Sequence, residues 1–137
     1  MNDSLRDYLR EIGCGEHVIE RGLVGLVEAW EKTVHDVERG YTLTLDDYLN
    51  DLDTRQLIAE ALVIASDDQR AAIDARLKKA DEKMRNLTTP VKVCLWGEEV
   101  AQEEGWTKKE NWWYFARPIK ADKELLAEID AAIENPE

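Results

Sequence analysis

Two clusters of acidic residues have the types and spacing that could hold a divalent metal ion. Glu28-x-x-Glu31 places two carboxylates on one face of an expected helix, and the next expected helix carries the run Asp-Asp-Tyr-Leu-Asn-Asp at residues 46–51. Carboxylates from paired helices can hold a divalent ion against a phosphate group. One hypothesis is therefore a metal-dependent hydrolase of phosphate esters or diphosphates. Its metal ligands would be Glu28, Glu31, His35, Asp47 and Asp51.

The run Asp-Asp-x-x-Asn-Asp resembles the aspartate-rich motif of terpenoid synthases, and Glu-x-x-Glu is similar to a motif of the all-α nucleotide pyrophosphohydrolases. Each resemblance covers only a few residues, and both imply metal-dependent chemistry on diphosphates. The competing interpretation is a solvated helix face, because acidic residues are common throughout a chain that contains 30 of them. We therefore keep the hydrolase as an alternative.

The cysteines and histidines form no clear metal-binding or redox pattern. Cys14-x-x-His17 has the spacing of a zinc-binding pair, but His35 and Cys94 lack a comparable spacing. We therefore expect no cofactor. Two cysteines do not make a disulfide framework, which favours a reducing compartment. The expected location is the cytoplasm.

An aromatic segment, residues 96–117, is the second candidate site. It contains four of the five tryptophans, at positions 96 to 113, and ends in Tyr-Phe-Ala-Arg. Trp and Arg side chains dominate many protein–protein interfaces. Because neighbouring side chains point in different directions on a helix or a strand, Trp112 and Trp113 cannot both face the core. The segment predicts either a plug at the end of a helical bundle, which is the favoured interpretation, or a surface that binds a partner.

The charge is unevenly distributed along the chain. There are 18 Lys plus Arg against 30 Asp plus Glu, a net charge of −12. Residues 46–74 contain eight acidic and two basic side chains, a net charge of −6, and residues 76–85 carry a net charge of +3. Acids at helix starts stabilise the helix dipole, which explains many of these residues. The remaining asymmetry could orient a charged partner, and the acidic stretch predicts a basic one.

Composition disfavours several classes of protein. Nonspecific nucleic-acid binding depends on Lys and Arg, so the negative charge argues against it. Nowhere do 18 apolar residues run together, and the chain is charged from residue 3, so we expect no membrane span and no signal peptide. Since 44% of the residues are apolar, we expect one core and a single helical domain over residues 1–137.

Capping signals and apolar periodicity predict the secondary structure. The expected helices cover residues 4–12, 16–39, 44–52, 53–65, 66–87 and 122–133. A further capping box at 107–110 leads into the aromatic residues 112–115, and the alternating run 91–96 is compatible with a short strand. Gly22 and Gly25 lie inside the second helix, where we expect a crossing helix to pack against their backbone. The expected fold is a compact, mainly α bundle of about six to seven helices with one irregular aromatic-rich segment.

The leading functional hypothesis is a non-catalytic protein-binding module of the inhibitor, immunity or adaptor type. The acidic stretch would steer a basic partner, and exposed members of the aromatic segment would anchor it. The expected binding residues are Asp46, Asp47, Asp51, Asp53, Trp106, Trp112, Trp113, Tyr114 and Arg117. The alternatives are the metal-dependent hydrolase and a structural subunit whose aromatic segment forms a homodimer interface.

Overall fold

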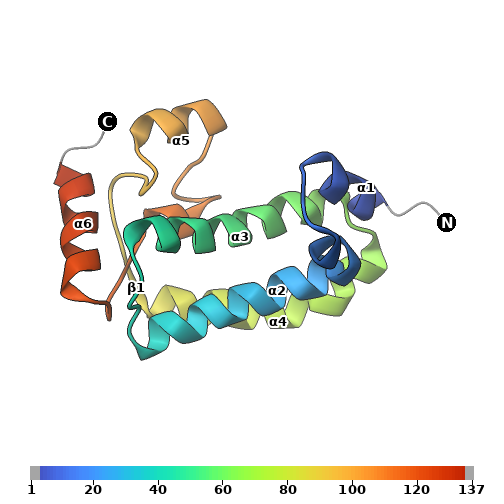
Figure 1. Ribbon diagram of the computed structural model, residues 1–137, viewed down its shortest axis with the longest axis horizontal. Coiled ribbons are helices and arrows are strands. Elements are labelled where there is room, and N and C mark those ends of the chain that lie inside the picture. Colours follow the sequence, from blue (N-terminus) through green and yellow to red (C-terminus); the bar gives the residue numbers. More distant parts are fainter. Residues whose placement is uncertain (1–3, 135–137) are drawn as a thin grey trace.

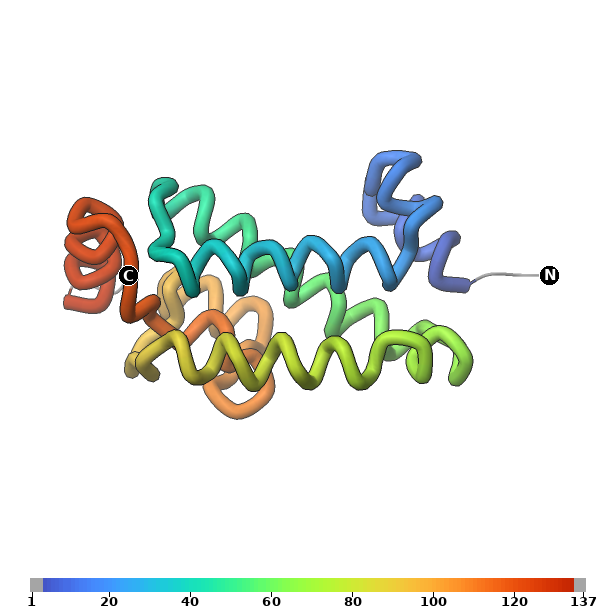
Figure 2. The backbone as a smooth tube through the Cα atoms, turned by 90° about the horizontal axis from the view of Figure 1, so that it is seen from below, coloured from blue at the N-terminus to red at the C-terminus, as the bar shows by residue number. Residues whose placement is uncertain are grey.

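Three long helices form the frame of the molecule. The computed structural model describes residues 4–134. Within them α2 (Glu16–Arg39), α3 (Leu45–Ile64) and α4 (Asp67–Asn86) run back and forth along the long axis (Figure 1). Helix α2 packs against both α3 and α4, and Figure 2 shows α2 and α4 lying along each other. The mainly α fold expected from the sequence is confirmed.

Shorter elements close the two ends of this frame. One end is covered by α1, which packs on α2 and α3, and the other by α6, which contacts α3 (Figure 1). The aromatic segment and a two-stranded sheet lie between α4 and α6 in the chain. The bounds of these elements are α1 Ser4–Glu11, β1 Thr88–Pro90, α5 Glu98–Glu104, the 3₁₀ helix η1 Trp112–Phe115, β2 Ala116–Pro118 and α6 Lys123–Glu134.

Two capping boxes fix where α3 and α4 begin, as the sequence predicts. The Thr44 hydroxyl accepts a hydrogen bond from the Asp47 backbone N–H at 3.2 Å, and the Asp47 carboxylate accepts one from the Thr44 backbone N–H at 3.3 Å. Ser66 and Gln69 make the same reciprocal pair at the start of α4. Each box satisfies N–H groups of a first turn that have no partner within the helix.

The expected break at Asp53 does not occur, because residues 45–64 form the single helix α3. The sequence from Asp53 to Gln56 has the pattern of a capping box, but Asp53 lies in the middle of the helix. Its carboxylate accepts hydrogen bonds from Trp96 and Tyr114 instead. Asp53 therefore contacts a distant segment of the chain, although its local sequence resembles the start of a helix.

The expected crossing helix at Gly22 and Gly25 is also wrong. Gly22 has φ 59° and ψ −144°, which kinks α2 at this residue. A Cβ atom on Gly22 would have no other atom within 4 Å, so close packing is not the reason for the glycine. At Gly25 the added Cβ would lie 2.6 Å from the Cβ of Arg21, on the same helix. Gly22 is therefore required by its backbone conformation, which side-chain-bearing residues rarely adopt.

The first strand ends just before residues 91–96, the run in which the sequence suggested a short strand. Residues 91–96 form no strand; β1 and β2 instead pair antiparallel, with Thr89 opposite Arg117. The N–H of Val91 donates to the Phe115 carbonyl at 2.8 Å, and that of Ile119 donates to the Leu87 carbonyl at 3.0 Å. In this pattern alternate residues point their backbone groups away from the partner strand. Pro90 and Pro118 occupy such outward positions, so neither proline costs the sheet a hydrogen bond.

In the aromatic segment, the sequence did not predict helix α5, and the capping box at residues 107–110 begins no α-helix. Helix α5 has no side-chain cap and is bracketed by Gly97 and Gly105, both with positive φ. The capping box at residues 107–110 forms a turn, in which the Glu110 N–H donates to the Thr107 hydroxyl at 3.1 Å. This turn leads into η1 instead of an α-helix.

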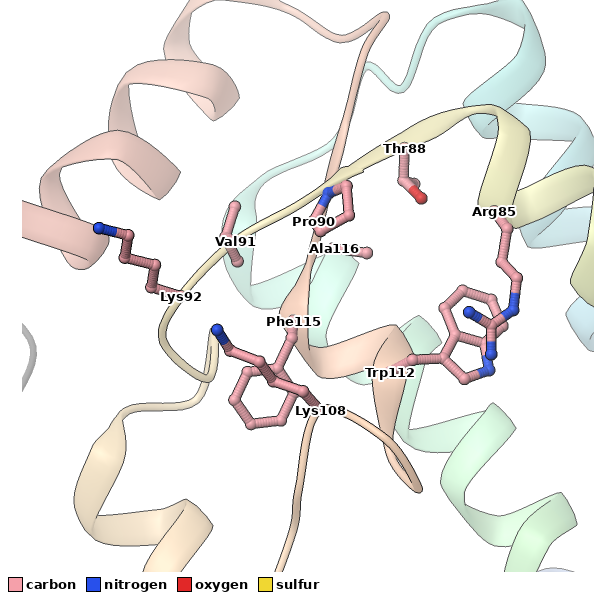
Figure 3. A pocket seen from close by; sticks show the side chains of 9 residues that line it. All are labelled: Arg85, Thr88, Pro90, Val91, Lys92, Lys108, Trp112, Phe115 and Ala116. Carbon is pink, nitrogen blue, oxygen red and sulfur yellow. The ribbon is translucent and has the colours of Figure 1, made fainter.

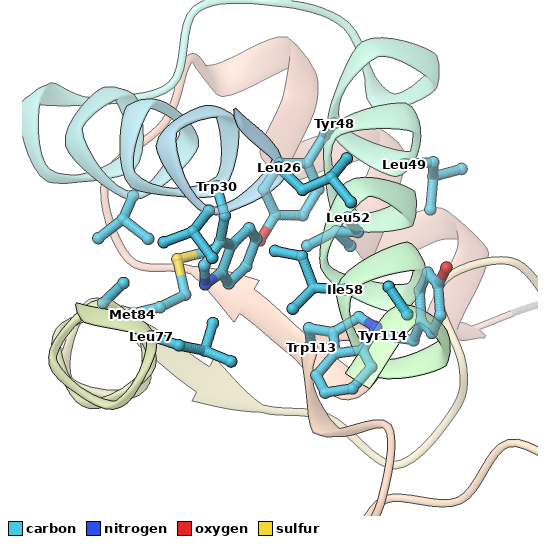
Figure 4. Close-up of a cluster of buried hydrophobic side chains, with 14 of the residues drawn as sticks. Leu26, Trp30, Tyr48, Leu49, Leu52, Ile58, Leu77, Met84, Trp113 and Tyr114 are labelled. Atoms are coloured by element: carbon cyan, nitrogen blue, oxygen red, sulfur yellow. The ribbon is translucent and has the colours of Figure 1, made fainter. Parts of the chain in front are cut away.

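The core contains side chains from all three long helices and from η1. Figure 4 shows Trp30 of α2, Met84 of α4 and Ile58 of α3 converging on one another, with Trp113 of η1 beside them. All four are at most 2% exposed. Trp113 of the aromatic segment is therefore part of the hydrophobic core, where its indole N–H has no hydrogen-bond partner among the described residues.

The kink at Gly22 can be tested by substitution. Gly22→Ala should lower the free energy of unfolding by about 2–3 kcal/mol, because an L-residue is strained in this conformation. Gly105→Ala is the matched control: its added Cβ also meets nothing within 4 Å, but its left-handed φ 73°, ψ 26° should cost only about 1–2 kcal/mol. Urea unfolding measures both values. Equal stability of wild type and Gly22→Ala would show that the kink does not depend on the glycine.

Candidate binding cleft

Asp53 on α3 holds the aromatic segment in place. Its Oδ1 accepts a hydrogen bond from the Trp96 indole at 3.0 Å and a second, very short one from the Tyr114 hydroxyl. The ring of Trp106 stacks on Tyr114, with centroids 4.1 Å apart and an interplanar angle of 19°. One carboxylate therefore positions three aromatic rings. Asp53 thus stabilises the fold, although the sequence predicted that it would lie on a partner-binding surface.

Trp113 is fixed by a second polar cluster. The Arg55 guanidinium lies 4.3 Å from the Trp113 ring centroid and donates two hydrogen bonds to Asp81, at 2.9 and 2.8 Å. Asp81 also accepts from the Trp30 indole at 2.9 Å. Trp113 is 2% exposed and Tyr114 is fully buried. These two residues therefore do not belong to the predicted partner surface.

Trp112 and its neighbour Trp113 differ in burial, as expected for adjacent residues. The two indoles meet edge to face, with centroids 5.8 Å apart and an interplanar angle of 77°. Trp112 is half-buried, and the Arg85 guanidinium lies 4.2 Å from its ring centroid. A cation at this distance from an indole face is attracted by the ring quadrupole. Of the adjacent pair, Trp112 is the ring that reaches the surface.

An open cleft of about 400 Å³ begins at Trp112, and we refer to it as the Trp112 cleft. Figure 3 shows it between the C-terminal end of α4, the strand β1 and η1. Its lining residues are Arg85, Thr88, Pro90, Val91, Lys92, Lys108, Trp112, Phe115 and Ala116. The volume lies within the range of pockets that bind ligands, about 300–1,000 Å³.

The lining of the cleft is positive, although the protein as a whole carries a net charge of −12. Arg85, Lys92 and Lys108 contribute three cations, and none of the acidic side chains in residues 4–134 lines the cleft. The remaining polar side chain, Thr88, already donates to the Met84 carbonyl at 2.9 Å. Aromatic and apolar walls with three cations are suited to hold an anionic group that carries an apolar body.

Arg117 and Trp106, two more of the predicted binding residues, do not line the cleft. Arg117 pairs with Asp130 of α6 through two hydrogen bonds, at 2.8 and 3.1 Å. This pair joins β2 to α6. Trp106 is half-buried in its stack on Tyr114.

The predicted acidic binding residues lie along the first half of α3. Asp46 and Asp47 are exposed, and Asp47 belongs to the capping box. Asp51 is half-buried and accepts a hydrogen bond from the Tyr41 hydroxyl at 2.5 Å. Burial raises the pKa of the Asp51 carboxyl, while the bond from Tyr41 opposes this change. A basic partner for Asp46 and Asp47 stays a prediction.

The residues of the metal hypothesis are not brought together. Glu28 pairs with Arg21, and Glu31 accepts two hydrogen bonds from Arg76, at 2.5 and 3.2 Å. His35 lies 3.9 Å from Glu38 on its own helix. Across residues 4–134, the structure contains no group of three His, Cys, Asp or Glu side chains that could hold a metal ion.

Comparison with known proteins gives no match to any protein-family model, curated protein or solved structure. In the part of the chain that the structure describes, the helices are too short or too polar to cross a membrane.

The three cations of the cleft were not recognised in the sequence. Arg85 belongs to the basic run of α4, while Lys92 and Lys108 lie in separate loops. They meet only because β1 pairs with β2 and brings η1 back to the end of α4. Their spacing in the chain has no period that would indicate a shared site.

The Arg55–Asp81 pair should dominate the stability of the frame that supports the cleft. Asp81→Ala should lower the free energy of unfolding by about 3 kcal/mol, because it leaves the mostly buried Arg55 without its counter-charge. Asp74→Ala, which breaks the exposed Asp74–Lys78 pair on the same helix, should cost no more than about 0.5 kcal/mol. In urea unfolding, the double variant Arg55→Met/Asp81→Leu should recover part of the loss. Equal costs for Asp81→Ala and Asp74→Ala would contradict a structural role for the pair.

The tyrosines should ionise only at very alkaline pH. Burial, together with the hydrogen bond to Glu60, raises the pKa of Tyr8 to about 12. Burial raises the pKa values of Tyr41, Tyr48 and Tyr114 further. Unfolded tyrosines lose their protons near pH 10, so this stabilisation is complete below pH 10 and declines as the pH rises towards 12. Tyrosinate absorbance should therefore stay flat near pH 10 and rise together with the loss of helical circular dichroism. A tyrosine of the folded protein that titrates near pH 10 would contradict this expectation.

Proposed function

We propose that this protein is a non-catalytic binding module that recognises another protein through the Trp112 cleft. The observation that carries the proposal is the cleft itself: a half-buried tryptophan and three cations surround an open, apolar space. Trp and Arg are the residue types most enriched among those that dominate binding energy at protein interfaces. The proposal keeps the binding role expected from the sequence and, of the predicted binding residues, keeps Trp112 as the one that lines the cleft.

The cleft is built on a rigid support, which favours specific recognition. Trp112 follows a turn tied to α3, where the Asn111 amide donates to Gln56 at 2.9 Å. The next residue, Trp113, is fixed in the core by Arg55. A binding side chain held by its neighbours loses little conformational entropy when a partner arrives.

The distribution of charge on the protein would orient an approaching partner. Asp46 and Asp47 are exposed at the start of α3, which lies near the junction with α2, whereas the cleft cations surround the end of α4 and the aromatic segment. Clusters of opposite charge at different places on the molecule orient a charged partner before contact and raise the association rate at low salt.

A comparative affinity capture tests this function. The wild type, Trp112→Ala and Arg85→Glu are immobilised and exposed to an extract of the source cells, and the bound proteins are identified by mass spectrometry. Lys79→Glu is the control, since Lys79 is exposed on the same helix as Arg85 but does not line the cleft. We expect a partner that binds the wild type and the control and is reduced at least about tenfold, or ~1.4 kcal/mol, by both cleft variants.

Circular dichroism shows whether each variant retains its helices. If folded cleft variants and the wild type recover the same proteins in equal amounts, the cleft is not the recognition site. Recovery of no partner by the wild type, with the extract at physiological salt, would contradict the function itself.

A further inference from the structure

The positive charges of the Trp112 cleft lie at two ends of an apolar floor. Figure 3 shows Arg85 beside Trp112 at one side and Lys92 and Lys108 at the opposite side. The floor between them is formed by Pro90, Val91, Phe115 and Ala116. This arrangement separates the charge sites by an apolar surface, which favours contact with an apolar group.

The three cations are available to a ligand. Within residues 4–134, none of Arg85, Lys92 and Lys108 has an acidic side chain within 4.0 Å. By contrast, Arg55 and Arg76 each make two hydrogen bonds to a carboxylate of the protein. In the part of the chain that the structure describes, no carboxylate therefore neutralises the cleft cations, although acidic residues outnumber basic ones by 30 to 18 in the sequence.

The position of the Arg85 guanidinium favours binding of a carboxylate. Its guanidinium lies over the Trp112 ring, and stacking on an aromatic face restricts the orientation of this planar group. A stacked guanidinium can still donate hydrogen bonds from its edge, and its fork geometry matches the two oxygens of a carboxylate. Lys92 and Lys108 provide point charges that tolerate a less defined position of the second anionic group.

We propose that the occupant of the cleft is an acidic peptide segment of the partner protein, in which a large apolar side chain lies between acidic residues. The apolar side chain rests on Phe115 and Val91, one carboxylate binds Arg85, and another lies between Lys92 and Lys108. This inference rests on the proposed function and names the chemistry of its partner. Charge complementarity selects an acidic segment, and the apolar floor selects the central residue.

Fluorescence anisotropy with synthetic peptides tests the occupant. The probe is a fluorescein-labelled peptide with the sequence Gly-Asp-Glu-Phe-Glu-Asp-Gly. One comparison peptide replaces every Asp and Glu by Asn and Gln, and another replaces Phe by Ala. We expect each replacement to weaken binding by about tenfold or more, because each removes one of the two recognised features.

Two protein variants locate the binding to the cleft. Lys108→Glu should weaken binding of the acidic Phe peptide by about tenfold or more, whereas Lys109→Glu should change it less than about threefold. Lys109 is the matched control, since it is the exposed neighbour of Lys108 in the same turn and does not line the cleft. Equal effects of the two variants would show general electrostatic attraction and overturn the assignment.

The remaining outcomes also decide between the proposals. Equal binding of the neutral peptide, equal binding of the Ala peptide, or no binding of the acidic Phe peptide at millimolar concentration would overturn this inference. If one of these results accompanies a cleft-dependent partner in the affinity capture, the binding function stands and only the acidic, apolar-centred ligand is wrong. If the affinity capture finds no cleft-dependent partner, the proposed binding function is wrong, and this inference is wrong with it.

Discussion

The ion pair between Arg55 and Asp81 is the interaction on which the arrangement of the other elements depends. It joins α3 to α4, its carboxylate accepts from Trp30 of α2, and its guanidinium lies over Trp113 of η1. Four elements thus converge on two charged side chains that are 9% and 18% exposed. Apolar packing alone tolerates many small shifts of one helix against another, whereas a bidentate pair accepts few. The pair therefore sets the spacing into which Trp113 inserts, and Trp113 in turn determines where Trp112 emerges.

Part of the negative charge of the chain serves as internal hydrogen-bond acceptors. Asp51, Asp53 and Glu60, all on α3, accept from Tyr41, Tyr114 and Tyr8. These bonds connect α3 to the N-terminal helix, to the loop after α2 and to the aromatic segment. Of the three long helices, α3 has the most negative net charge, and several other segments of the chain are tied to it. For this reason a count of acidic residues overestimates the acidic surface, and the unneutralised cations of the cleft are the more informative charges.

Local signals in the sequence predicted local structure well and distant contacts poorly. The boxes at Thr44 and Ser66 were predictable because a cap and its first turn lie within four residues of each other. Asp53 was misinterpreted because the groups that need its carboxylate lie 43 and 61 residues away. Gly22 was recognised as unusual, but the sequence could not distinguish close packing from a strained backbone. The aromatic segment was identified correctly as a feature, while the separation of buried Trp113 from half-buried Trp112 required the fold.

The two prolines of the small sheet have a consequence for self-association. The edge of a sheet offers outward N–H and C=O groups to which another chain could add a strand, although the outward residues of β2, Ala116 and Pro118, are already buried. Pro90 removes a donor from one edge and Pro118 removes a donor from the other. Strand addition between copies would therefore leave carbonyls without partners on both sides. The two prolines therefore protect the sheet against edge-to-edge aggregation.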